Sequence, residues 1–149
     1  MIRKPVLPPT YLVVAIIVMV ALHFVFPIKS IIQFPWNLLG LLPLVLGAAL
    51  NIVADRDLRN TMTTVKPYQE STTLVTTGAY RISRHPMYLG FALTLLGLAI
   101  LLGSLAPFFV VPIFAVVMAR VFIVVEEQML AERFGHLWLD YKARVRCWV

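Results

Sequence analysis

Two short polar segments of this 149-residue chain carry the side chains that could do chemistry. The first runs from Gly78 to Gly90 and contains an imidazole, two guanidinium groups and two phenols, and the second is Glu126-Glu127. Each segment lies where a long apolar run meets polar sequence. Charge is costly beside hydrocarbon, so charged groups in such a place indicate a binding or catalytic site.

The residue types in the two segments suggest what such a site would bind. Pro86 suits the first turn of a helix, and the free amide groups at that start, together with Arg84, favour an anion. His85 can donate, accept or carry a proton near neutral pH. Glu126 and Glu127 favour a cationic group, so the two segments together predict a pocket for a zwitterionic ligand. Each segment also has a structural alternative. The basic residues of the first segment could simply fix the orientation of the chain in the membrane, and the two glutamates could form an ion-pair network at a helix end.

The composition predicts what surrounds these segments. Of all residues 60% are hydrophobic and 13% are charged, whereas a soluble domain has about 25% charged residues. A mean hydropathy of +0.88 therefore predicts a single membrane domain over residues 1–149. Pro27 and Lys29 follow the first apolar run, so we expect no cleavable signal. With one cysteine, Cys147, and no HExxH spacing, we expect no disulfide within the chain and no metal.

Four apolar runs predict an all-α integral membrane protein, with spanning helices at about 11–26, 36–54, 87–102 and 105–125. Only Gly103-Ser104 separates the last two runs, which predicts a tight helical hairpin. Glycines recur at seven-residue spacing in the second and third runs and predict close helix contacts; they are Gly40, Gly47, Gly90 and Gly97. His23, alone in the first run, is predicted to be a core histidine with a hydrogen-bond partner.

The basic residues predict the orientation in the membrane. All 13 Lys and Arg residues except Lys29 and Arg120 lie near the termini or in the loop 55–86. The positive-inside rule therefore places both termini and that loop in the cytoplasm, in an inner or plasma membrane, and membrane contact explains the net charge of +6 better than nucleic acid does.

The segment 126–146 is predicted to form a further helix after the last span. It carries one apolar stripe, made of Leu130, Phe134, Leu137, Tyr141 and Val145. Such a helix would lie against the cytoplasmic membrane surface as an amphipathic helix. A soluble extension that packs on the other inner loops is the alternative.

Several sequence segments, taken in order, resemble those of a known family. They are Leu74-Val75-Thr76-Thr77-Gly78-Ala79-Tyr80, then Arg84-His85-Pro86-Met87-Tyr88-Leu89-Gly90, then Glu126-Glu127 with Leu130, Phe134-Gly135 and Tyr141. Over roughly residues 70–148 the chain resembles the isoprenylcysteine carboxyl methyltransferases, whose wider group includes the membrane phospholipid methyltransferases. Two positions depart from the pattern, Thr72 in place of a histidine and Trp138 in place of a tyrosine.

The resemblance implies S-adenosylmethionine as methyl donor, bound on the cytosolic side among the last spans. By position, the residues that would surround this cofactor are Leu74, Val75, Tyr80, Arg84, His85, Pro86, Met87, Tyr88 and Gly90, and Glu126 and Glu127 would meet its amino group. His85 would hold the cofactor or act as a base. Arg120 lies near where the carboxyl methyltransferases place a substrate-binding arginine and would hold an acidic acceptor.

The leading hypothesis is therefore methyl transfer to a lipophilic or membrane-partitioned acceptor, with a carboxyl, amine or thiol as the accepting group. Two alternatives stay open from the sequence. One is an NADPH-dependent membrane reductase related to the sterol reductases, which look similar in this carboxyl-terminal region. The other is a non-enzymatic membrane scaffold. No nucleic-acid partner is expected, and the sequence does not predict an oligomeric state.

Overall fold

The computed structural model describes residues 7–26, 28–61 and 73–149, and among these it contains helices and no strand. The long helices are α1 (Pro8–Val25), α2 (Leu41–Asn60), α3 (Pro86–Leu102) and α4 (Leu105–Met118). Two 3-10 turns, η1 (Trp36–Gly40) and η2 (Gly78–Arg81), precede α2 and α3, and a π-helical segment, η3 (Ala119–Ile123), joins α4 to α5 (Val124–Phe134) and α6 (His136–Arg144). The predicted all-α fold is confirmed.

Three of the helical stretches are long and apolar enough to cross a membrane. They are Pro8–Val25, Trp36–Asn60 and Leu105–Phe134. The fourth apolar helix, α3, has 17 residues and is about 25 Å long, which is less than the hydrocarbon thickness of about 30 Å. The predicted membrane protein is thus supported by three helices, and the count of four spans is not confirmed. Because α3 packs against α1, α2 and α4, much of its surface faces protein instead of lipid.

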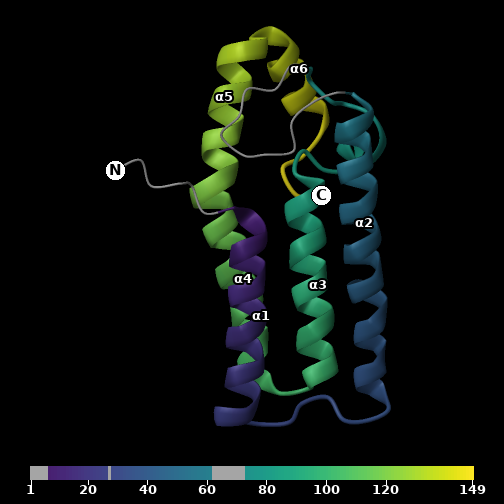
Figure 1. Ribbon diagram of the computed structural model, residues 1–149, viewed down its shortest axis with the longest axis vertical. Helices are drawn as coiled ribbons and strands as arrows, with labels where there is room; N and C mark the ends of the chain where they lie inside the picture. The colour runs from purple at the N-terminus through teal and green to yellow at the C-terminus, as the bar shows by residue number, and fades with distance from the viewer. Residues whose placement is uncertain (1–6, 27, 62–72) are drawn as a thin grey trace.

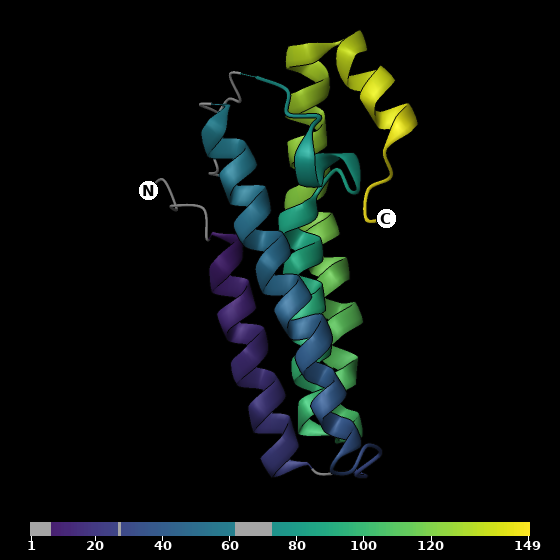
Figure 2. The same ribbon diagram turned by 90° about the vertical axis from the view of Figure 1, so that its right-hand side faces the viewer.

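The four long helices lie side by side and alternate in direction (Figures 1 and 2). The starts of α1 and α3 and the ends of α2 and α5 lie toward the upper end in Figure 1, where α6 also lies. Most basic residues of the described chain belong to these upper elements, whereas Lys29 lies in the connection at the lower end. Of the basic segments that the sequence assigns to one side, those in the described part of the chain therefore lie at one end.

The glycine contacts predicted from the seven-residue spacing are present between α2 and α3. A Cβ atom added to Gly47 would lie 2.5 Å from the Gly90 carbonyl oxygen, and one added to Gly97 would lie 2.6 Å from the Gly40 carbonyl oxygen. Both distances are far below van der Waals contact, so only glycine lets the two backbones approach this closely. The two pairs set the spacing of α2 and α3 along their length.

The turn between α3 and α4 is the predicted tight hairpin. Gly103 ends α3 with a φ of 70°, and Ser104 stands at the start of α4. The connection after α1 crosses this turn, since Ile31 donates its backbone N–H to the Gly103 carbonyl at 2.8 Å. His23 Nδ1 lies 2.8 Å from the Ser104 hydroxyl, so this histidine has the predicted hydrogen-bond partner, although it is half-buried and lies outside the core.

The prediction of one continuous helix over 126–146 is wrong, because the structure has two helices there. Its first part, α5, continues the last span through η3 without a break, and Gly135 then ends it with a φ of 53°. Because glycine adopts this left-handed conformation at little cost, the chain reverses and α6 folds back along the molecule (Figure 2). The break resets the helical register, so α6 buries Trp138 and Tyr141 and leaves Leu137, a predicted stripe residue, 64% exposed.

The helix limits differ in smaller ways from those predicted. The first helix begins at Pro8, and the second continues to Asn60, beyond the predicted end at 54. The predicted loop 55–86 is therefore shorter, and its residues 62–72 lie outside the described residues. The prediction of one domain over the whole chain stays a prediction.

The close approach of α2 and α3 predicts a stability effect. Gly47→Ala would place a methyl group against the Gly90 carbonyl and should lower the free energy of unfolding by about 1–3 kcal/mol, as overpacking usually does. Thermal unfolding in detergent would measure the change. Ala48→Val, on the exposed side of the same helix, is the matched control. Equal melting temperatures for the two variants would contradict the packing role of Gly47.

Candidate functional site

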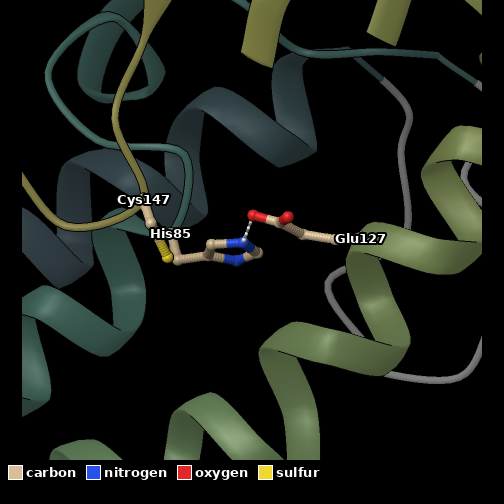
Figure 3. Close-up of side chains that lie close together, drawn as sticks. All are labelled: His85, Glu127 and Cys147. Carbon is tan, nitrogen blue, oxygen red and sulfur yellow. Dashed lines mark hydrogen bonds and ion pairs between the residues drawn. The ribbon is translucent and has the colours of Figure 1, made fainter. Parts of the chain in front are cut away.

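The two polar segments meet at His85. Pro86 starts α3 as predicted, so His85 stands at the N-terminal boundary of that helix with 6% of its surface exposed. Its Nδ1 atom lies 3.4 Å from Glu126 Oε2, and its Nε2 atom lies 3.4 Å from Glu127 Oε1. Both ring nitrogens therefore face carboxylates, one from each of two neighbouring residues of α5 (Figure 3 shows His85 and Glu127).

Glu127 is the most heavily paired group of this cluster. Arg84 Nη2 lies 2.8 Å from Glu127 Oε1, and Lys142 Nζ lies 2.9 Å from Glu127 Oε2. Only 15% of the Glu127 side chain is exposed, and a buried carboxylate is costly unless it is paired and hydrogen-bonded. Glu127 thus ties the segment before α3 to α6.

Glu126 has a different environment. The Tyr88 hydroxyl donates to Glu126 Oε1 at 2.5 Å, and the Tyr88 ring stacks on His85 with 5.8 Å between centroids. On its other side Tyr88 lies against Phe122, at 6.1 Å between centroids. The Glu126 side chain is 25% exposed, more than that of Glu127, and it forms no ion pair with lysine or arginine within the described chain. Glu126 is therefore the more exposed and the less heavily paired of the two carboxylates.

Arg84 binds the carboxyl-terminal segment. Its Nη1 atom donates to the carbonyl oxygens of Lys142 and Val145, both at 3.1 Å, where α6 ends. Its guanidinium carbon lies 5.8 Å from the ring centroid of Trp138. These contacts satisfy carbonyls that a helix end leaves without a partner. Arg84 would have to leave some of them in order to meet a ligand anion.

The protonation states of the cluster follow from its charges. Burial of the imidazole opposes its charged form, but the hydrogen bonds and charges of Glu126 and Glu127 outweigh this cost and raise the pKa of His85 above its ordinary 6.5. Burial also raises the pKa of Tyr141 to about 12. Its hydroxyl therefore stays protonated and donates to the Tyr80 carbonyl at 2.6 Å. Burial, aided by the charge of Glu126, raises the pKa of Tyr80 as well.

His85, Glu127 and Cys147 also form a group that could hold a metal ion, with ligand atoms within 4.8 Å of one another (Figure 3). Arg84 and Lys142 already occupy the oxygens of Glu127, and their charges oppose a further cation. Burial raises the pKa of the Cys147 thiol, which disfavours the thiolate that a metal prefers. The sequence-based expectation of no metal stays a prediction.

The remaining predicted site residues lie in several places. Pro86 and Val75 are buried, whereas Leu74, Tyr80 and Met87 are half-buried, all of them in or near the segment that leads into α3. Gly90 faces α2, where an added Cβ would collide with Asn51, so its structural role is helix contact. Arg120 lies exposed in η3, seven residues before Glu127, and is not part of the cluster around His85.

Sequence reasoning did not assign site roles to three residues that contact this region. Lys142 and Trp138 reach Arg84 or Glu127 only because the chain reverses at Gly135. Asp57 reaches the η2 turn from the end of α2. The Phe134-Gly135 pair is a common helix-ending signal and would have predicted the reversal.

The sequence profile of one known family, described as phospholipid methyltransferase, matches residues 36–136. The chain belongs to the phospholipid methyltransferase family. The match covers α2, α3, α4 and α5 with the two polar segments, and it ends at the first residue of α6. The family includes isoprenylcysteine carboxyl methyltransferase-like proteins, so the resemblance drawn from the motifs is confirmed. No curated protein and no solved structure matches the chain.

Membership of the phospholipid methyltransferase family indicates a methyltransferase that acts on a lipid-type substrate in a membrane. The three long apolar helices agree with this membrane location.

The paired state of His85 predicts a pH dependence of stability. Because its folded-state pKa is raised, the contribution of His85 is complete below about pH 6.5 and is lost as the pH rises through the folded-state pKa. The difference in melting temperature between the wild type and His85→Gln should therefore shrink from pH 6 to pH 9 in detergent. The exposed His136→Gln is the control and should differ little from the wild type. A difference that grows with pH would contradict this protonation state.

Proposed function

We propose that the chain is an S-adenosylmethionine-dependent methyltransferase acting on a lipophilic or membrane-partitioned acceptor. The observation that carries this proposal is the cluster of Glu126, His85 and Tyr88 where α3 begins. The chain belongs to a family of membrane methyltransferases, and a cluster at the edge of its apolar helices would let a polar donor meet an acceptor from the bilayer. Both termini would then face the cytoplasm, because the basic segments of the described chain lie at this end.

The residues of the cluster fit the charges of this donor. S-adenosylmethionine carries an ammonium, a carboxylate and a sulfonium, and when bound it supplies an activated methyl group. Glu126 would hold the ammonium, since its carboxylate is the more exposed of the pair and its partners within the described chain are Tyr88 and His85. His85, with its raised pKa, would offer a positive charge to the carboxylate. Tyr88 presents an aromatic ring, which attracts cations.

The acceptor need not be activated by His85. A carboxylate can accept a methyl group without losing a proton, whereas an amine must first lose one. The two glutamates raise the pKa of His85 and so favour its protonated form, which cannot take up a further proton as a base. His85 is therefore proposed to hold the donor. Correct alignment of donor and acceptor supplies much of the rate in such a reaction, and that alignment is the task of the helices.

Arg120 is proposed to hold the acceptor. It is exposed in the π-helical segment of an otherwise apolar helix, where a charged residue is costly without a function. Single π-turns occur frequently at functional sites. A guanidinium at this place would bind an anionic group of the acceptor, such as a carboxylate or a phosphate.

The donor site predicts the effect of two substitutions. In detergent, the wild type should bind S-adenosylhomocysteine, and Glu126→Gln and His85→Gln should each weaken binding about tenfold or more, as loss of a charged hydrogen-bond partner does. Isothermal titration would measure the dissociation constants. Glu132→Gln, an exposed glutamate of the same helix, is the matched control. Unchanged binding after loss of both Glu126 and His85 would overturn the site assignment, and NADPH binding instead would favour a reductase.

The acceptor role of Arg120 predicts a separable kinetic effect. Arg120→Gln should raise the KM for the acceptor about tenfold and leave the affinity for S-adenosylhomocysteine unchanged, because Arg120 is not part of the cluster around His85. Transfer of labelled methyl groups into a lipid extract would identify the acceptor and provide the assay. Arg133→Gln, exposed on α5, is the control. Equal KM values for wild type and Arg120→Gln would contradict the role.

A further inference from the structure

A carboxylate at the end of α2 holds the turn that leads into the site. Asp57 lies in the last turn of α2, and its Oδ2 atom accepts a hydrogen bond from the backbone N–H of Ala79 at 2.9 Å. Ala79 belongs to η2 and is 4% exposed. The bond joins residues 22 positions apart, so it fixes how η2 lies against the helix pair α2 and α3.

Gly78 makes this contact possible. Its φ of 62° is a left-handed conformation that other residues rarely adopt. A Cβ atom added at this position would also collide with the carboxyl group of Asp57. The glycine thus serves both the turn and the close approach of the carboxylate.

The segment from Gly78 to His85 is fixed at its other end as well. The Ser83 hydroxyl donates to the Cys147 carbonyl at 2.9 Å, and the Arg84 N–H donates to the Arg146 carbonyl at 3.0 Å. Ser83 also accepts the backbone N–H of His85 at 3.1 Å. Asp57 at the start and the carboxyl-terminal residues at the end therefore determine where Tyr80, Arg84 and His85 stand.

We propose that Asp57 is a positioning residue for the donor site, acting through the η2 turn on Tyr80 and His85. The inference rests on the proposed function and extends it to a residue outside the cluster around His85. Asp57 accepts a backbone amide and touches none of the groups assigned to the donor, so its effect is indirect. A side chain that keeps an accepting oxygen at this place should preserve the function.

Asp55 provides a matched control for Asp57. It lies two residues earlier on the same helix, and its carboxylate pairs with Arg59 Nε at 2.7 Å within the same helix. Arg59 is exposed at this ion pair, and within the described chain Asp55 forms no hydrogen bond or ion pair with η2. Replacing Asp55 removes the same charge from the end of α2 without removing the bond to Ala79.

The test compares Asp57→Ala, Asp57→Asn and Asp55→Ala with the wild type in detergent. Isothermal titration gives the affinity for S-adenosylhomocysteine, and hydrogen exchange of a peptide that contains Ala79 reports on the turn. Asp57→Ala should weaken binding about tenfold and speed exchange at Ala79, because a hydrogen bond to a charged acceptor is lost. Asp57→Asn, which keeps an accepting oxygen, and Asp55→Ala should remain within about threefold of the wild type.

The outcomes separate this inference from the proposed function. A wild type that does not bind S-adenosylhomocysteine overturns the proposed function and the inference with it. A wild type that binds, with Asp57→Ala binding equally well or Asp55→Ala binding equally poorly, overturns the inference alone. If Asp57→Ala does not fold, Gly78→Ala replaces it, since a methyl group there pushes the turn away from an intact Asp57.

Discussion

Burial of the Glu127 carboxylate is the constraint on which the candidate site, where α3 begins beside α5 and α6, depends. A carboxylate with 15% of its surface exposed requires partners, and here they are Arg84, His85 and Lys142. These partners come from the segment before α3 and from α6, so one charge joins α3, α5 and α6. Loss of both Arg84 and Lys142 would leave this buried carboxylate without the cations that compensate it, which costs more than the pairs contribute. The contacts therefore act as a unit.

The packing of α3 determines the position of these contacts around Glu127. Gly40, Gly47, Gly90 and Gly97 allow α2 to approach α3 to backbone contact. That approach brings Asp57, at the end of α2, within hydrogen-bond distance of η2. On the other side, Tyr88 contacts Phe122 of the last span. Helix packing inside the apolar region thus determines the position of the polar groups at its edge.

The sequence predicts much of this arrangement, for identifiable reasons. Apolar runs and glycine spacing are local patterns, so the helices, the hairpin at Gly103 and the contacts of α2 with α3 followed from them. The meeting of His85 with Glu126 followed from the charge distribution. The reversal at Gly135 was missed because the apolar stripe continues across it, and the partners Lys142 and Asp57 depend on chain positions 15 and 22 residues away. Such pairings are set by tertiary structure, which periodicity does not encode.

One continuous helical stretch carries both proposed binding groups, and this has a chemical consequence. Arg120 and Glu126 are six residues apart between η3 and α5, a rise of about 9 Å. Arg120 is exposed on the apolar part of the stretch, whereas Glu126 faces His85 and Tyr88. A methyl transfer between a polar donor and a membrane acceptor needs both molecules in line. Because Arg120 and Glu126, which would bind them, lie on one rigid helical stretch, the relative motion of donor and acceptor would be limited. The π-helical segment, which contains Arg120 and ends three residues before Glu126, sets the angle between the two side chains, so its geometry bears directly on that alignment.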